Sequence, residues 1–416
     1  MIPILFILRL KRGRRMPGAR NGRVSWLTAA CAGATALFLL GCNDPGPELP
    51  ELDPVLVAEG KEIFRYDTFG DEQYWTDTLR MHEVIQGAVS PRAALGVGLK
   101  VDVDALPQPV RDALAAGQID LDDPAITVTL LKLNAVVGAQ GVVETVNGRD
   151  TLTRFGITCA LRHSTVDNSF APGIGKRLDG WPNTTLNPGA IVALSPAVDA
   201  PTKAVLNSWG PGKYDPRINF DGLSTPLVLP PAYGLRGVDK ETFTAEGPVS
   251  YWNAYVAVTQ MHGQGTFIDP RIGVNIVQAP DLVTPKLAAL AEYQLSLKTP
   301  EAPAGSFDAA AAQRGRALFT GAANCASCHT GGILSDVNTG KLHAPSETGM
   351  DGAYAARTTQ KAYRTTPLRG LWQHAPYFHD GSALTLADVV EHYNTVRNLN
   401  LTDAQKRDLV EYLKTL

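Results

Sequence analysis

Near its C-terminal end the chain has two cysteines and a histidine in one short motif, Cys325-Ala-Ser-Cys328-His329. On one turn of helix, this spacing directs all three side chains toward the same face. The two thiols can then add to the vinyl groups of a haem while the imidazole binds the iron. A thioredoxin-like pair would need a βαβ context and a zinc site would need a fourth ligand nearby, and the sequence shows neither. The motif therefore predicts a covalently bound haem c with His329 as an iron ligand.

A second stretch, Cys159-Ala-Leu-Arg162-His163, repeats this pattern with arginine in place of one cysteine. The remaining cysteine and the histidine keep their spacing, so geometry allows one thioether bond and one iron–nitrogen bond. Two interpretations stay open. Either a second haem is held by Cys159 and His163, with Arg162 near a propionate, or the two residues are a buried cysteine and a loop histidine without a cofactor. Met261 and His262 are candidates for the far side of such a haem, although a Met-His pair more often serves packing.

The N-terminal stretch has the features of an export signal. A basic cluster at 9–23 precedes an apolar run at 24–40, which is shorter than the ~20 residues that a membrane-spanning helix needs. The run ends in LLGC, which resembles the bacterial lipobox, and in that motif Cys42 would be acylated after cleavage. We therefore expect a signal peptide at 1–41, a lipid anchor on Cys42, and a Pro-rich acidic tether at 42–54.

The composition limits the remaining possibilities. A chain of 416 residues suffices for two or three domains, and a formal net charge of −3 gives no indication of nucleic-acid binding. The chain has 5 cysteines. Once Cys31 leaves with the signal peptide and Cys42 carries lipid, the others all lie in the two motifs. The cysteines therefore serve chemistry rather than a disulfide framework.

The distribution of residue types along the sequence indicates two domains. Helical signals run from residue 55 to about 146, and Gly, Pro, Asn and Asp then crowd between 155 and 271. A helical pattern returns at 284–297, and a Pro/Ala linker follows at 298–307. We predict a mainly α fold with two cytochrome c-like domains. The first, at 55–300, is enlarged by long Gly/Pro-rich loops and holds the degenerate motif, whereas the second, at 308–416, is a compact class I-type cytochrome c domain.

Helix signals frame this second domain. Asp308 can cap a helix whose Ala-rich body runs to Phe319, just before the cysteine motif. At the other end, Thr402 or Asp403 can cap a terminal amphipathic helix with apolar residues at helical spacing up to Leu416. A helix, a motif turn, loops and a terminal helix are the layout of a small all-α cytochrome c domain.

The segment YRTTPLRGLWQHAPYFHDGSALTLADVVEHYN, residues 363–394, carries a family resemblance. It is similar to the C-terminal domain of the bacterial di-haem cytochrome c peroxidases and of the related di-haem enzyme that matures tryptophylquinone. The match covers about the last quarter of the chain, and the middle region with its degenerate motif matches more loosely. The resemblance implies a peroxidase-like architecture with two haems, and relatives of this kind also bind calcium between their domains. The sequence offers no oxygen-ligand pattern that would name calcium ligands.

The sixth iron ligand of the C-terminal haem is open at this stage. By the register of the resemblance, Tyr393 falls where those proteins place a methionine or a tyrosine, while Met350 is where a simple mono-haem cytochrome would place its methionine. His343, His374 and His379 are the remaining alternatives. A thioether would raise the reduction potential and a phenolate would lower it.

These features predict an exported c-type cytochrome that carries single electrons in the periplasm, between a periplasmic donor and acceptor, and is tied to the membrane through its N-terminal lipid. The resemblance implies an alternative, a di-haem peroxidase or oxidase acting on hydrogen peroxide at the N-terminal haem. A third interpretation is a lipoprotein scaffold that retains only the C-terminal haem. No catalytic acid–base residue can be assigned by spacing.

Overall fold

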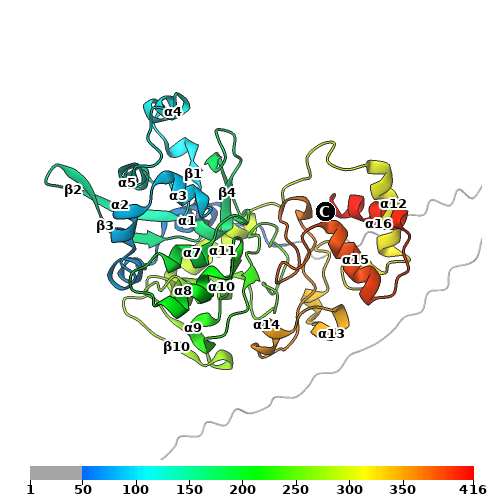
Figure 1. The fold of residues 1–416 in the computed structure, drawn as a ribbon. Coiled ribbons are helices and arrows are strands. Elements are labelled where there is room, and N and C mark those ends of the chain that lie inside the picture. The colour runs from blue at the N-terminus through cyan, green and yellow to red at the C-terminus, as the bar shows by residue number, and fades with distance from the viewer. Residues whose placement is uncertain (1–48) are drawn as a thin grey trace, which may run out of the picture. The chain divides into compact units, whose positions relative to one another are not determined.

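The computed structural model describes residues 49–416 (Figure 1). The predicted signal peptide, the acylation site Cys42 and the first part of the tether lie outside the described residues. The described residues belong to one compact unit that begins at Pro47. Within 49–416, no helix is long and apolar enough to cross a membrane.

The described chain is largely helical, as predicted, and its strands are short. The α-helices are α1 (Pro54–Tyr66), α2 (Met81–Ala88), α3 (Pro91–Gly96), α4 (Gln108–Ala115), α5 (Pro124–Lys132), α6 (Ala160–His163), α7 (Pro188–Ala193), α8 (Ala200–Asn207), α9 (Ile218–Asp221), α10 (Val249–Tyr255), α11 (Leu287–Ser296), α12 (Ala309–Thr320), α13 (Pro345–Thr348), α14 (Ala353–Ala356), α15 (Leu386–Val396) and α16 (Asp403–Leu413). The 3₁₀ turns are η2 (Val103–Ala105), η4 (Pro270–Ile272), η5 (Thr284–Lys286), η6 (Cys325–Ser327), η7 (Val337–Thr339) and η8 (Leu371–Gln373), and the π-helical turns are η1 (Gln73–Thr78) and η3 (Val256–Gln260).

Each strand pairs with one partner. The strands are β1 (Val101–Asp102), β2 (Ala139–Val146), β3 (Arg149–Ile157), β4 (Ser164–Val166), β5 (Ile174–Gly175), β6 (Arg177–Asp179), β7 (Lys213–Tyr214), β8 (Leu227–Val228), β9 (Phe267–Asp269) and β10 (Val274–Ile276). The pairs β2–β3, β4–β6, β7–β8 and β9–β10 are antiparallel, and β1–β5 is parallel. The division into two haem-type domains at 55–300 and 308–416 stays a prediction.

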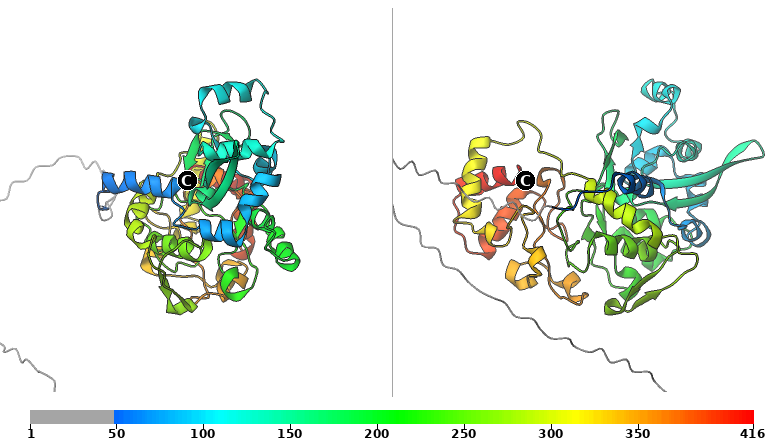
Figure 2. Two further views of the ribbon diagram at one scale, coloured as in Figure 1. Left: turned by 90° about the vertical axis from the view of Figure 1, so that its left-hand side faces the viewer. Right: turned by 180° about the vertical axis from the view of Figure 1, so that it is seen from behind.

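The hairpin of β2 and β3 corrects the expectation of helix up to about residue 146. The hairpin extends away from the helices in both Figure 1 and Figure 2. Asn147 and Gly148 form its turn with φ of 51° and 77°. Asn-Gly with two positive φ values is a strong hairpin signal, and valines and threonines on both sides favour strands. The hairpin matters for the site, because β3 ends two residues before Cys159.

The C-terminal region packs α12, α15 and α16 around a small apolar core, in which Phe319, Val390 and Leu409 are buried. Asp308 accepts hydrogen bonds from two backbone N–H groups at the start of α12, so the predicted cap is confirmed. At α16 the cap is Thr402, in a capping box with Gln405. This compact arrangement delivers the cysteine motif directly after α12.

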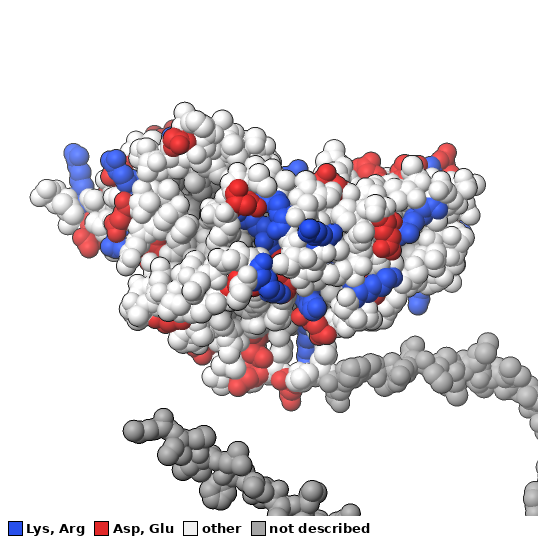
Figure 3. Space-filling view, turned by 90° about the horizontal axis from the view of Figure 1, so that it is seen from below, with Lys and Arg blue, Asp and Glu red and all other residues white. Residues whose placement is uncertain are grey.

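A buried ion-pair network joins the middle of the chain to the C-terminal region. Arg357, which follows α14, bonds Asp215 and Asp221, each at 2.7 Å, and its side chain is 5% exposed. Arg217 bonds Glu246 and lies beside the ring of Tyr354 on α14. Such charges are costly to bury unless paired, so the network fixes how these segments meet. On the face drawn in Figure 3, charges of both signs are interspersed.

Candidate haem-binding site

The C-terminal motif forms a tight turn after α12. The backbone N–H of His329 donates to the carbonyl of Cys325 at 3.0 Å, which sets cysteine and histidine one helical turn apart. The imidazole is held by Nδ1, which lies 3.0 Å from the carbonyl oxygen of Leu334. A carbonyl can only accept, so Nδ1 carries the proton and Nε2 keeps the lone pair that an iron ligand needs.

The electrostatics of this turn suit a metal ligand. Burial lowers the pKa of His329, so the imidazole is neutral at pH 7. Burial raises the pKa of Cys325 to about 11, so its thiol is protonated and unreactive in the folded chain. The turn contacts the core through Phe319, whose ring centroid lies 6.2 Å from that of His329.

The degenerate motif adopts the same histidine geometry. The backbone N–H of His163 donates to the carbonyl of Cys159 at 3.2 Å, and Nδ1 lies 3.0 Å from the carbonyl oxygen of Pro230. Burial, with a smaller contribution from the charge of Arg162, lowers the pKa of His163 to about 4. Among residues 49–416, neither His163 nor His329 has a hydrogen-bond partner at Nε2. Both imidazoles are therefore neutral and oriented to offer Nε2.

Close packing holds the degenerate motif in place. At Gly138, with φ of 76°, a Cβ atom would lie 2.0 Å from the backbone nitrogen of Leu161, so only glycine fits against α6. Downstream, Ser164 donates to Asp179 at 2.8 Å, and Asp179 also accepts from Tyr293 at 2.6 Å. The motif is thus held by close packing against Gly138 and by the hydrogen bonds of Ser164 just after it.

Arg162, at the position of the missing cysteine, packs on an aromatic ring. Its guanidinium lies 4.0 Å from the centroid of the Tyr214 ring. Tyr214 in turn donates to Gln260 on the π-helical turn η3 at 2.6 Å. The expected role of Arg162 near a propionate is untested, but the cation–π contact gives the residue a defined position.

Met261 and His262, the predicted far-side candidates, differ in their environments. Met261 is 2% exposed and packs in the core. His262 has a positive φ of 64°, a conformation uncommon outside glycine, and stacks on Tyr74 with centroids 3.6 Å apart. Tyr74 lies on η1 and His262 follows η3, and π-helical turns are frequent at functional sites. Within 49–416, the imidazole of His262 has no hydrogen-bond partner, and its nitrogens are not sealed from solvent.

Of the candidates for the sixth ligand, Tyr393 lies near the C-terminal motif. Burial raises the pKa of its phenol to about 12, and the proximity of Cys325 and Cys328 adds to this rise. Met350 instead packs against the apolar cluster around Tyr354. The assignment of either residue as an iron ligand stays a prediction.

The three alternative histidines have other surroundings. His343 has both ring nitrogens within hydrogen-bond distance of carboxylates, 2.9 Å from Glu347 and 3.2 Å from Asp336. His379 lies against Tyr363. The ring of His374 packs 5.6 Å from that of Tyr377, and burial lowers its pKa.

Potential metal-ligand atoms also gather beside the motif. Within 49–416, the atoms of Cys328, Asp336 and His343 lie within 4.8 Å of one another. A sulfur that has formed a thioether to haem is a poor ligand for a second metal, so this group belongs to the haem surroundings. Calcium, which the resemblance implies, stays a prediction.

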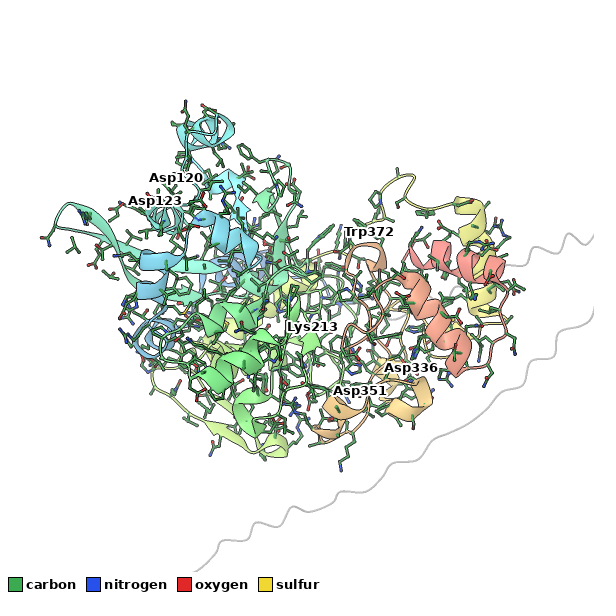
Figure 4. All side chains as sticks on the ribbon, viewed as in Figure 1. Asp120, Asp123, Lys213, Asp336, Asp351 and Trp372 are labelled. Carbon is green, nitrogen blue, oxygen red and sulfur yellow. The ribbon has the colours of Figure 1, made fainter. Side chains whose placement is uncertain are left out.

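An aromatic contact connects the two motif-bearing regions. Trp181 follows Gly180, whose N–H donates to the carbonyl of His163 at 2.8 Å. The Trp181 ring meets Trp372, on the 3₁₀ turn η8, edge to face with centroids 5.6 Å apart, and Figure 4 labels Trp372. Tyr233 also packs on Trp181, at 6.4 Å.

Sequence reasoning did not find the groups that orient the two imidazoles. Both are backbone carbonyls, and that of Pro230 is supplied 67 residues beyond His163. No side-chain pattern marks such an acceptor. The sequence does not indicate Tyr74 and Tyr214 either, because a single tyrosine belongs to no recognisable motif.

Comparison with known proteins agrees with this geometry. Residues 312–416 match the cytochrome c family. The methylamine utilization protein MauG of Methylorubrum extorquens is 32% identical over 31% of this chain and 43% of its own length. The cytochrome-c peroxidase IdrP2 of a Pseudomonas species is 34% identical over 31% of this chain and 47% of its own length. The chain thus covers less than half of each of these relatives.

Solved structures show only a weak likeness. A MauG-like protein associated with microbial copper homeostasis is 20% identical, with a TM-score of 0.34 over 47% of this chain and 74% of that protein. The C-terminal part of the chain is a cytochrome c domain, and the chain is related to the di-haem cytochrome c peroxidase-like proteins.

Proposed function

We propose that the protein binds two haems and reduces hydrogen peroxide with single electrons from a periplasmic donor. The observation that carries this proposal is the shared geometry of His163 and His329, each held through Nδ1 by a backbone carbonyl at 3.0 Å. A hydrogen bond from Nδ1 to a carbonyl is the arrangement that fixes the tautomer and the ring orientation of a metal-ligating histidine. The names of the relatives, a cytochrome-c peroxidase among them, support the chemistry.

The residues present fit a haem at each site. At the C-terminal site Cys325 and Cys328 would form the two thioethers, and His329 and Tyr393 would be the iron ligands. At the N-terminal site Cys159 would form a single thioether and His163 would be the nitrogen ligand. When bound, haem would supply one-electron redox chemistry.

His262 is our candidate for the acid–base group of the N-terminal site. Burial lowers its pKa, so the neutral imidazole can accept a proton from peroxide at pH 7 and return it to the leaving oxygen. The position of His262 supports this role. Tyr74 stacks on its ring, and Tyr214, which lies near Tyr74, packs its own ring against the guanidinium of Arg162 in the degenerate motif. The pair Trp181 and Trp372 offers a contact through which electrons pass between the two regions.

A second candidate function is electron transfer alone, with one haem at the C-terminal motif. The replacement of a cysteine by Arg162 favours it, because the usual double attachment cannot form there. In this case the neutral His163 would serve only as a donor to Pro230.

Export to the periplasm and attachment through a lipid on Cys42 belong to the same proposal. They depend on the basic cluster, the apolar run and the lipobox-like LLGC.

The decisive experiment combines the intact mass of the chain matured in a bacterial periplasm with a peroxide turnover assay. We expect a mass with two covalent haems, together with turnover that His262→Gln lowers by about 100-fold or more. Thr259→Ser, which changes a buried hydroxyl residue on the π-helical turn that precedes His262, is the matched control. One haem without turnover would contradict the proposal and leave electron transfer alone.

The sixth ligand is tested separately by Tyr393→Met. A phenolate ligand predicts that this change raises the reduction potential of the C-terminal haem by on the order of hundreds of millivolts. Met350→Leu should leave the potential unchanged. If the potential follows Met350 instead, the assignment of Tyr393 is wrong.

A further inference from the structure

Outside the two motifs, the C-terminal region buries a tyrosine against a histidine. The phenol oxygen of Tyr363 lies 3.0 Å from Nε2 of His379, and the two ring centroids are 4.3 Å apart. Tyr363 is 6% exposed and His379 is 5% exposed. The proposed function uses neither side chain.

Other groups around the phenol of Tyr363 limit the acceptors that are available to its proton. Its oxygen accepts the backbone N–H of Ala355 at 3.2 Å and lies 2.9 Å from the carbonyl oxygen of Asp351, a residue labelled in Figure 4. The ring of Phe243 packs edge-on against His379, with centroids 6.3 Å apart. The single phenolic proton thus has two possible acceptors, the carbonyl and the imidazole, in a pocket from which bulk water is excluded.

The two acceptors differ in basicity. A phenol that loses one electron becomes a strong acid, so its oxidation is easy only where a base takes the proton at once. An imidazole at 3.0 Å is such a base, because this distance is within reach for proton transfer. A backbone carbonyl is a far weaker base. Burial lowers the pKa of His379 more than the nearby carboxylates of Asp380 and Asp351 raise it, so the imidazole is neutral at pH 7.

The pair is also close to the C-terminal haem motif. Tyr363 and His343 exchange two backbone hydrogen bonds, of 2.7 and 2.9 Å. The side chain of His343 belongs to the group of ligand atoms that includes Cys328. On the other side, Phe378 precedes His379 and packs against Tyr393, with centroids 6.0 Å apart. One residue, His343, lies between the pair and the motif on the first path, and two residues, Phe378 and Tyr393, lie between them on the second.

We propose that Tyr363 is a redox-active tyrosine that stores one oxidising equivalent, with His379 as its proton acceptor. In this step Tyr363 gives one electron toward the C-terminal motif and its phenolic proton to Nε2 of His379. The products are a neutral phenoxyl radical and an imidazolium. An electron from the donor later reduces the radical, and the proton returns to the phenol.

That hydrogen peroxide supplies the oxidising equivalent rests on the proposed function. Hydrogen peroxide takes up two electrons and two protons to give two water molecules, and Tyr363 supplies one of these electrons. The geometry of the pair does not depend on peroxide. The proposal can therefore be tested with an oxidant that bypasses peroxide.

The experiment oxidises the haem-loaded full chain with photogenerated tris(bipyridine)ruthenium(III) and records the electron paramagnetic resonance spectrum after freezing. We expect a phenoxyl signal that narrows when ring-deuterated tyrosine is incorporated. The signal should be lost in Tyr363→Phe. It should also be lost in His379→Gln, which keeps a hydrogen-bonding side chain but removes the base, while the haem absorbance of both variants stays that of the wild type.

Tyr377→Phe is the matched control. Tyr377 is also buried, but its hydroxyl donates to the carbonyl of Leu371 at 2.6 Å and makes no hydrogen bond to an imidazole within residues 49–416. Its variant should keep the signal. A signal that persists in Tyr363→Phe, or one that disappears in Tyr377→Phe alone, would overturn the proposal. A signal after photo-oxidation but none after peroxide would support the pair and contradict peroxide reduction.

Discussion

The two motif turns place their histidines alike but differ in their cysteines. His163 and His329 each use Nδ1 to bond a carbonyl at 3.0 Å, and each is neutral because it is buried. Only the C-terminal turn has both cysteines. The comparison shows that the orientation of the histidine does not depend on the second cysteine of such a turn.

The surroundings of the two motif turns also differ. The C-terminal turn lies in a small domain, where Gly315 lets α12 approach α16 so closely that a Cβ would lie 2.0 Å from the carbonyl oxygen of Asp408. The N-terminal turn packs instead against a much larger core, and burial raises the pKa of Cys159 to about 12. A haem in the small domain depends more on its thioethers, whereas one in the larger core can be retained by packing.

The largest effect should come from replacing both cysteines of the complete motif. Cys325→Ala with Cys328→Ala should lower the intact mass by one haem and cost about 4 kcal/mol or more of unfolding free energy, since a bound cofactor stabilises the folded chain. Urea unfolding of both proteins followed by far-ultraviolet circular dichroism measures the cost. Ser327→Ala, an exposed residue in the same turn, should change the stability by less than about 0.5 kcal/mol.

The next effect separates attachment from ligation at the degenerate motif. In Cys159→Ser we expect the second haem to stay bound through His163 but to become extractable with acidified acetone. In His163→Ala the thioether remains and the spectrum of the second haem changes to that of an iron without its nitrogen ligand. If the wild-type protein contains a single haem, both expectations are wrong, because they require a second haem at the degenerate motif.

A smaller effect is expected from restoring the motif. Arg162→Cys should leave the number of haems unchanged and add a second thioether, which the absorption maximum of the alkaline pyridine complex reports. Arg162→Ala should lose only the contact with Tyr214, worth about 0.5–2 kcal/mol. If Arg162→Cys gains a haem that the wild type lacks, the arginine prevents cofactor binding, and the two turns are less alike than their histidines indicate.

Local signals in the sequence were sufficient for the C-terminal region. Asp308 and Thr402 cap helices because a side-chain oxygen next to an apolar periodic run is a local device, and the cysteine motif is local as well. The Asn147-Gly148 turn is a local signal as well, and together with the valines on both sides it predicts the hairpin that the structure shows.

What could not be predicted depends on contacts distant in sequence. The carbonyl of Pro230 that orients His163 becomes a ligand-positioning group only through the fold. The same holds for the approach of Tyr214 to Arg162 and of Tyr363 to His379, since spacing along the chain contains no information about either pair.

Another effect concerns a buried acid near the N-terminal turn. Asp71 is 0% exposed and accepts the N–H of Ile157, at the end of β3, at 3.2 Å. Burial raises the pKa of its carboxyl to about 9, so the group is protonated in the folded chain at pH 7. Its proximity also adds to the rise in the pKa of Cys159, which places the acid beside the degenerate motif.

The sign of the resulting pH dependence follows from proton release. The unfolded carboxyl ionises near pH 3.8 and the folded one near pH 9, so unfolding releases a proton throughout this window. Stability therefore falls as the pH rises, by at most about 1.4 kcal/mol per pH unit. Asp71→Asn should remove this slope in urea unfolding. Asp269→Asn is the control, because a hydrogen bond from Arg271 lowers the pKa of Asp269 to about 2, outside the window. Parallel curves for wild type and Asp71→Asn would show that the acid is already ionised in the folded chain, and that the N-terminal turn carries a buried negative charge.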